Sequence, residues 1–262
     1  MGSATSQALA AAREAVAKLG RTELQLADDL FAAGRIVGDS SQLRHALTDT
    51  DADAGKKRAL VQAVFGGRLG TGALELLTQL AEHRWSRSSD LLEGIEETGI
   101  RVAVASTDAD VPGELFAFER LVSGDAELEL AIGSKLSAAG SKVQIVDRLL
   151  AGKASPQTVA IVRHLVQQPR GRRIGELLDG AADVAAEALG YEVATVTSAA
   201  PLGAEQITRL EQSLAGQYGR KLRINAIVEP ALIGGIRVQI GDDVIDGSIA
   251  QRLSSLRQKL AG

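Results

Sequence analysis

Residues 229–260 read EPALIGGIRVQIGDDVIDGSIAQRLSSLRQKL and place turns, strands and a helix start close together in one segment. Within it, Ile236, Val238 and Ile240 alternate with Arg237 and Gln239. A period of two residues is typical of a strand that buries one face. The segment therefore predicts a short strand over 236–240.

Turns flank this strand, and a helix start follows it. Gly234-Gly235 suit a tight reversal with positive φ, and Gly241-Asp242 indicate a second turn before Val244. Ser248 and Gln251 have the spacing of a capping box. A helix from Ser248 would carry one apolar stripe, formed by Ile249, Leu253, Leu256 and Leu260. No Lys-Ser/Thr pair follows the glycines, so a phosphate-binding P-loop is not indicated.

The residues before this segment complete a small mixed module. Alternating β-formers predict strands over 192–198 and 221–228, and an apolar helical face predicts a helix over 204–217. With the strands and helix described above, residues 191–262 are expected to form a β-α-β-β-α module. The expected fold class is α+β and mostly α, since helical patterns fill the rest of the chain.

The module carries a motif of a known family. The pattern P-x-L-I-G-G-x-x-V-x-x-G-D-x-V-I-D-G-S resembles the C-terminal signature of the delta subunit of F-type ATP synthases, the oligomycin-sensitivity-conferring protein family. The matching residues are Pro230, Leu232, Ile233, Gly234, Gly235, Val238, Gly241, Asp242, Val244, Ile245, Asp246, Gly247 and Ser248. This many matches at fixed spacing make a specific resemblance.

Composition narrows the class of protein. The chain has 262 residues, no cysteine and a formal net charge of −4. The missing cysteines exclude disulfides and thiolate metal sites, and they fit a reducing cytoplasm. The negative charge disfavours nucleic acid as the main partner. No apolar run is long enough to cross a bilayer, and the first twenty residues lack the features of a signal peptide.

The helical part repeats itself. Leu30-Phe31-Ala32 recurs as Leu115-Phe116-Ala117, 85 positions later, and Lys57 recurs as Lys142 at the same offset. Further matches follow in the same order over both segments, and after one residue of slippage Leu91-Leu92 match Leu177-Leu178 at an offset of 86. A colinear series of this kind indicates an internal duplication.

Each copy predicts five helices. They are expected over 23–37, 42–47, 56–65, 73–84 and 90–106 in copy one, and over 112–122, 126–132, 141–150, 156–167 and 173–189 in copy two. A separate helix over 5–19 precedes them. The expected organisation is an N-terminal helix that joins the bundle (1–22), copy one (23–107), copy two (108–190) and the C-terminal module (191–262).

Several possible sites fail on their spacing. Asp49, Asp51 and Asp53 begin like a calcium loop, but Ala54 and Leu60 stand where glycine and glutamate are required, so a solvated loop is expected. The three histidines are scattered, without the spacing of a metal site. No serine nucleophile elbow is present. No catalytic residue, cofactor or metal site is therefore predicted.

Two features have alternative interpretations. Arg170, Arg172 and Arg173 form the densest basic cluster, either as a solvated loop that leads into a helix or as a contact for an acidic partner segment. Trp85, the one tryptophan, is expected to anchor a core rather than an interface.

The resemblance implies a function. It implies a non-catalytic stator subunit in the peripheral stalk of a proton-translocating ATP synthase, needed for ATP synthesis by rotation. The helical domain would bind N-terminal segments of the alpha subunits, and the C-terminal module would bind the b-type stalk. The protein would then lie on the cytoplasmic face of the cell membrane, held there by its complex. Copy one is additional to the common, shorter form of the family, so its role is not implied.

Contact residues can be suggested from the apolar faces. Leu9, Val16, Leu165 and Val166 would line a groove for an alpha segment or else fill the core of the bundle. Leu253, Leu256 and Leu260 would contact the stalk or else close the sheet. Two other functions stay open from the residues alone: a free-standing helical adaptor, and a small-molecule enzyme built on the C-terminal module.

Overall fold

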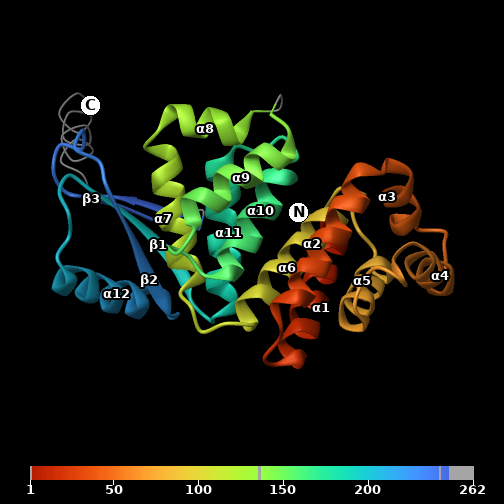
Figure 1. Ribbon diagram of the computed structural model, residues 1–262. Coiled ribbons are helices and arrows are strands. Elements are labelled where there is room, and N and C mark those ends of the chain that lie inside the picture. The colour runs from red at the N-terminus through yellow and green to blue at the C-terminus, as the bar shows by residue number, and fades with distance from the viewer. Residues whose placement is uncertain (1, 135–136, 242, 248–262) are drawn as a thin grey trace, which may run out of the picture. The chain divides into compact units, whose positions relative to one another are not determined.

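The computed structural model describes residues 2–134, 137–241 and 243–247 and divides the chain into two compact units (Figure 1). Unit one is Met1–Ala185 and unit two is Ala186–Gly262. The first unit is helical, whereas the second combines a helix with a four-stranded sheet. The predicted α+β, mostly α fold class is confirmed.

Unit one contains two series of helices. The first series is α1 (Ser3–Leu19), α2 (Leu24–Asp39), α3 (Ser41–Thr48), α4 (Ala54–Phe65), α5 (Thr71–Glu82) and α6 (Asp90–Ala105). The second is α7 (Val111–Ser123), α8 (Ala126–Gly133), α9 (Ala139–Leu150), α10 (Pro156–Gln167) and α11 (Ile174–Ala188), whose last residues belong to unit two. Each helix lies within a few residues of its predicted bounds.

Short polar residues start several of these helices. The side chain of Asp53 accepts a hydrogen bond from the Lys56 amide, and that of Ser155 accepts one from the Thr158 amide. Such caps satisfy amides that have no partner inside the helix. The Asp49–Asp53 segment is thus a helix-to-helix loop, as predicted: Asp49 accepts from the Asp51 amide, and Asp53 caps α4.

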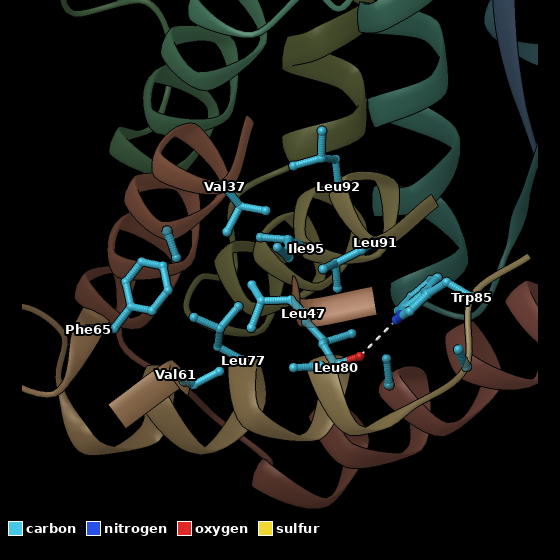
Figure 2. Close-up of a cluster of buried hydrophobic side chains, with 14 of the residues drawn as sticks. Val37, Leu47, Val61, Phe65, Leu77, Leu80, Trp85, Leu91, Leu92 and Ile95 are labelled. Carbon is cyan, nitrogen blue, oxygen red and sulfur yellow. Dashed lines mark hydrogen bonds between the residues drawn. The ribbon is translucent and has the colours of Figure 1, made fainter. Parts of the chain in front are cut away.

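Copy one is held by a continuous apolar core (Figure 2). Phe65, Leu47 and Leu77 are fully buried within it. Trp85 is 6% exposed, and its Nε1 donates a hydrogen bond to the Leu80 carbonyl oxygen at 2.8 Å. Full burial of a leucine or phenylalanine side chain contributes about 1.5–3 kcal/mol. The prediction that Trp85 is a core anchor is confirmed.

Unit two is built on a mixed sheet. Its strands are β1 (Glu192–Ser198), β2 (Leu222–Val228), β3 (Ile236–Ile240) and β4 (Asp243–Asp246), in the order β2-β1-β3-β4. β1 pairs in parallel with β2 and antiparallel with β3, and β3 pairs antiparallel with β4. Helix α12 (Ala204–Tyr218) makes the crossover between β1 and β2.

One face of this sheet forms the core of unit two. Ala194, Val196, Val238 and Ile240 are buried there against Leu214 of α12. The alternation predicted for 236–240 is confirmed, because Val238 and Ile240 are buried while Arg237 and Gln239 are exposed. Gly234, Gly235 and Gly241 all have positive φ, so their predicted role as turn residues is also confirmed.

Candidate functional site

Helix α6 lies at the centre of unit one and serves both copies. Thirteen of its 16 residues are buried, whereas only five of the 17 residues of α1 are. A helix buried on nearly all sides must pack against neighbours all round. The N-terminal helix α1 and the copy-one helices α2 and α5 contact α6, and α10 contacts it from copy two.

The contacts of α10 repeat those of α5. Helix α5 contacts α1, α2 and α4, and α10 contacts α6, α7 and α9. Since α10 lies 85 positions after α5, helix α6 takes in copy two the place that α1 takes in copy one. The two copies are therefore parts of one helical unit that share a helix.

Copy one reaches α6 through an apolar contact. The ring of Trp85 lies so close to Gly94 that a Cβ added there would be 2.3 Å from the ring atom Cη2. Only glycine allows this approach of the indole to the helix backbone. Trp85 thus fixes the α5–α6 connection against the first turns of α6.

Copy two reaches α6 through charges. Arg170 occupies the repeat position of Trp85, and its Nη2 lies 2.7 Å from Oε1 of Glu96. Nη2 of Arg172 donates to both oxygens of Glu96, at 2.8 Å and 3.0 Å. Nε2 of His164, from α10, lies 3.5 Å from Oε2 of Glu96. We call Glu96, His164, Arg170 and Arg172 the Glu96 cluster.

The Glu96 cluster corrects the interpretation of the basic loop. Arg170 and Arg172 were expected either in a solvated loop or against an acidic partner. Both are instead paired with a carboxylate of the same chain, and the Arg170 side chain is only 18% exposed. The spacing of the arginines gave no sign of this, because Glu96 is 74 positions away from Arg170 and has alanine, Ala182, at its repeat position in copy two.

Electrostatics keep Glu96 ionised. Burial alone would raise the pKa of its carboxyl, but the hydrogen bond from His164 and the charges of Arg170 and Arg172 lower it to about 2. The pKa of His164 is lowered, chiefly because burial disfavours the imidazolium. Arg170 also has a φ of 49°, an unfavourable region for a residue other than glycine. The ion pair with Glu96 stabilises this strained turn.

An aromatic contact from copy one covers the cluster. The ring of Phe31, in α2, stacks on His164 with ring centroids 4.6 Å apart and an interplanar angle of 18°. The backbone of α2 comes close at Gly34, where an added Cβ would be 3.4 Å from Cε1 of His164. Together, α2, α6 and α10 enclose the imidazole, so residues from both copies build this site.

A second device is repeated in both copies. Oδ2 of Asp29, in α2, accepts a hydrogen bond from the Gly70 amide at the start of α5. At the equivalent place, Oε2 of Glu114 in α7 accepts from the amide and hydroxyl of Ser155 at the start of α10. Thr158 donates to the same oxygen at 2.5 Å. An acidic residue thus ties the first helix of each copy to the fourth.

The contact residues suggested for the helical unit are buried. Leu9 and Val16 are 4% and 6% exposed, and Leu165 and Val166 are 1% and 2% exposed. They fill the core, which was the alternative expectation. An alpha segment would reach them only if covering helices moved apart. The suggested stalk contacts Leu253, Leu256 and Leu260 lie outside the described residues, as do Asp242 and Ser248 of the signature.

Other signature residues are on the surface of unit two. Ile233 is 68% exposed, Val244 is 57% exposed and Ile245 is 41% exposed. All four residues of β4 are exposed, and this strand forms one edge of the sheet. The described part of the signature therefore combines turn glycines with exposed apolar side chains.

The described part of the chain thus defines a scaffold: a helical unit fixed by a shared helix, joined to a small mixed module. Neither a helix long and apolar enough to span a bilayer nor a cluster of metal-binding side chains occurs within it. The model of the ATP synthase delta (OSCP) subunit family matches residues 100–260. The chain belongs to this family, whose members are structural, non-catalytic subunits of ATP synthase.

Relatives of similar length support this membership. ATP synthase subunit delta of Leifsonia xyli is 52% identical over 265 residues, with 100% of both chains covered. That of Streptomyces griseus is 38% identical over 271 residues, again with 100% of both covered. A chain in the structure of the Toxoplasma gondii mitochondrial ATP synthase hexamer is 22% identical and has a TM-score of 0.40, with 65% of this chain and 98% of that chain covered.

The family match begins within α6. Residue 100 lies in the second half of the helix that copy two shares with copy one. Copy two and the C-terminal module are thus the part that the family model describes, and helices α1–α5 precede it. The protein is a structural peripheral-stalk subunit, and the alternative of a free-standing adaptor is not supported.

Proposed function

We propose that this chain connects the catalytic head of the ATP synthase to its b-type stalk, so that the torque of the rotor drives ATP synthesis instead of turning the head. In this proposal the helical unit binds N-terminal segments of the alpha subunits, and the C-terminal module binds the distal end of the b-type subunits. The complex holds the protein at the cytoplasmic face of the cell membrane.

The observation that carries the stalk contact is the exposed part of the signature. Ile233, Val244 and Ile245 are large apolar residues that the described residues leave in solvent. Exposed apolar side chains grouped in one segment are typical of a protein-binding surface. A load-bearing joint needs such contacts and no reactive group, which agrees with the residues of the signature.

The helical unit suits a rigid connection to the head. Because α6 belongs to both copies, one copy cannot turn relative to the other without disrupting a helix that is buried on nearly all sides. Residues 108–190 and 191–262 remain the proposed head-binding and stalk-binding domains, with residues 23–107 as an inserted copy after the N-terminal helix of residues 1–22. Leu253, Leu256 and Leu260 remain proposed stalk contacts beside the exposed signature residues.

The stalk contact can be tested with the full chain. We expect Ile233→Asp combined with Val244→Asp to weaken binding to the b-type subunits at least tenfold, which is about 1.4 kcal/mol. Its midpoint of thermal unfolding should stay close to the wild-type value, because both side chains are exposed. Gln212→Asp, on an exposed part of α12, is the matched control and should bind normally. Unchanged binding of the double variant would refute this assignment.

A further inference from the structure

Three buried polar atoms of the Glu96 cluster have no hydrogen-bond partner among the described residues: Nδ1 of His164, and Nε and Nη2 of Arg170. Nδ1 of His164 makes no hydrogen bond, although the side chain is only 4% exposed. Buried polar atoms in proteins are nearly always paired, so a lone one marks a special site. Its other nitrogen, Nε2, faces Glu96 at 3.5 Å and therefore carries the proton of the neutral ring.

Three elements bring charges to this imidazole. On helix α6, the charge of Glu96 acts on the imidazole of His164, and the charge of Glu93 acts on the neighbouring Arg170. Helix α2 contributes Arg35, and the loop after α10 contributes Arg170 and Arg172. Cations thus face the ring from α2 and from the loop, while Glu96 already binds two guanidinium groups.

We propose that His164 is an acid-sensitive latch between the two helical copies: the neutral imidazole holds α10 against α2 and α6, and its protonation loosens this contact. The neutral ring fits the space beneath Phe31 and leaves Nδ1 without a hydrogen to donate. A second proton would place an N–H on Nδ1, where no acceptor is present among the described residues. It would also bring a charge near Arg35 and Arg170.

The direction of the pH effect follows from linkage. The folded-state pKa of His164 lies below the ordinary value of 6.5, mainly because of burial. The contact is therefore fully stable above 6.5 and weakens as the pH falls from there toward the folded-state pKa. Glu96 acts in a different window, because its pKa is lowered from 4.5 to about 2 and its contribution is lost only below 4.5. Between pH 6.5 and 4.5, the histidine is the member of the cluster that responds.

The duplication offers a matched variant. Copy one has Gln79 at the repeat position of His164, so the helix accepts an amide there. His164→Gln keeps a polar group that can donate to Glu96 and cannot be protonated. Phe31→Leu, a second variant, removes the aromatic cover and leaves the histidine in place.

The test is hydrogen exchange of the full chain at pH 7.5, 6.5 and 5.5, corrected for the intrinsic pH dependence of exchange. In the wild type, we expect the protection of α2 and α10 to fall by up to about tenfold per pH unit below 6.5, which is the effect of taking up one proton. Helix α4, which packs on α3 and α5, should keep its protection. In His164→Gln, the fall in α2 and α10 should be absent.

A wild-type measurement makes the test independent of how well the variant folds. The chain has three histidines, so the imidazole signals of His45, His83 and His164 can be followed together by NMR. His164 should titrate below its ordinary value of 6.5, and the loss of protection should follow its titration. In Phe31→Leu, His164 should titrate at a higher pH than in the wild type, closer to its ordinary value of 6.5. The proposal fails if His164 titrates at or above its ordinary value of 6.5, or if His164→Gln loses protection as the wild type does.

Discussion

Trp85 and Arg170 occupy the same position in the two copies, and both fasten their copy to α6, but by opposite physical means. Trp85 packs its ring against Gly94, without charge and without space between the groups. Arg170 pairs with Glu96, a buried carboxylate that also binds Arg172 and His164. The duplicated frame is the same, but the partner differs, because the two copies contact different faces of one helix.

The shared helix α6 is thus held by two contacts of different physical character. An apolar contact is stabilised by packing and tolerates little change of volume. A buried ion pair gives little net stability, yet the loss of one partner is costly because the other charge is left unpaired. Adding volume should therefore destabilise the Trp85–Gly94 contact of copy one. Removing one charged partner should destabilise the Glu96 contact of copy two.

The largest expected effect comes from the charged side of this comparison. Glu96→Ala would leave Arg170 and Arg172 facing a buried site without their carboxylate. We expect the free energy of unfolding to fall by about 3–5 kcal/mol, the usual cost of breaking a buried pair. Urea denaturation followed by circular dichroism measures this change.

An exposed pair serves as the control for Glu96→Ala. Arg58 and Glu82 are 2.7 Å apart, and the arginine is 67% exposed. Glu82→Ala should cost less than about 1 kcal/mol, because solvent screens the pair. Equal losses in the two variants would show that the Glu96 cluster has no special role.

The apolar side should give the next largest effect. In Gly94→Ala, the new methyl group would overlap the ring of Trp85, so the indole or α6 must shift. We expect a loss of about 1–3 kcal/mol, typical of overpacking, together with a changed tryptophan fluorescence spectrum. Gly180→Ala, in α11, meets no atom within 4 Å and should stabilise the chain by up to about 1 kcal/mol through helix propensity. An unchanged spectrum and stability in Gly94→Ala would contradict the close contact.

The elements of the fold were predictable because their signals are local. Ser155-Pro156 marks the start of α10, and the alternation at 236–240 gives β3 its bounds. Repeat pairs such as Leu30 and Leu115, both fully buried, kept the two copies in register. Each of these signals lies within one element or is repeated at a fixed offset.

The contacts between the copies were not predictable in the same way. Glu96 is one acidic residue among several in α6, and its burial depends on α2 and α10 meeting above it. The duplication did not help, because Ala182 and Gln79 stand at the repeat positions of Glu96 and His164. That α6 is shared became visible only from its burial and its neighbours in space.

A third prediction compares the two acidic ties. Glu114 accepts hydrogen bonds from both the amide and the hydroxyl of Ser155 and from Thr158, whereas Asp29 accepts one from the Gly70 amide. Glu114→Ala should therefore cost about 1–3 kcal/mol and Asp29→Ala about 0.5–1.5 kcal/mol, since each net hydrogen bond contributes about 1 kcal/mol. Urea denaturation of both variants checks this order, and a larger loss for Asp29→Ala would reverse the interpretation.

The smallest expected effect lies on α11. Partial burial, together with Glu119 and Asp183, raises the pKa of Asp179 to about 6. Because the folded state holds this proton more tightly than the unfolded chain, Asp179 lowers stability as the pH rises from about 4 to 6. Asp179→Asn should remove that fall and stabilise the chain at pH 7.5. The gain should be less than about 1 kcal/mol, because the side chain still reaches solvent, which screens its charge. In copy one, Glu93 stands at the repeat position of Asp179, and Gly34 stands at that of Glu119. The charge near Glu93 is that of Arg170. Glu93→Gln should therefore give no such gain in stability. Thermal unfolding of both variants at pH 5 and 7.5 tests this difference. A gain of equal size in both would show that the acidic surroundings of Asp179 do not distinguish copy two.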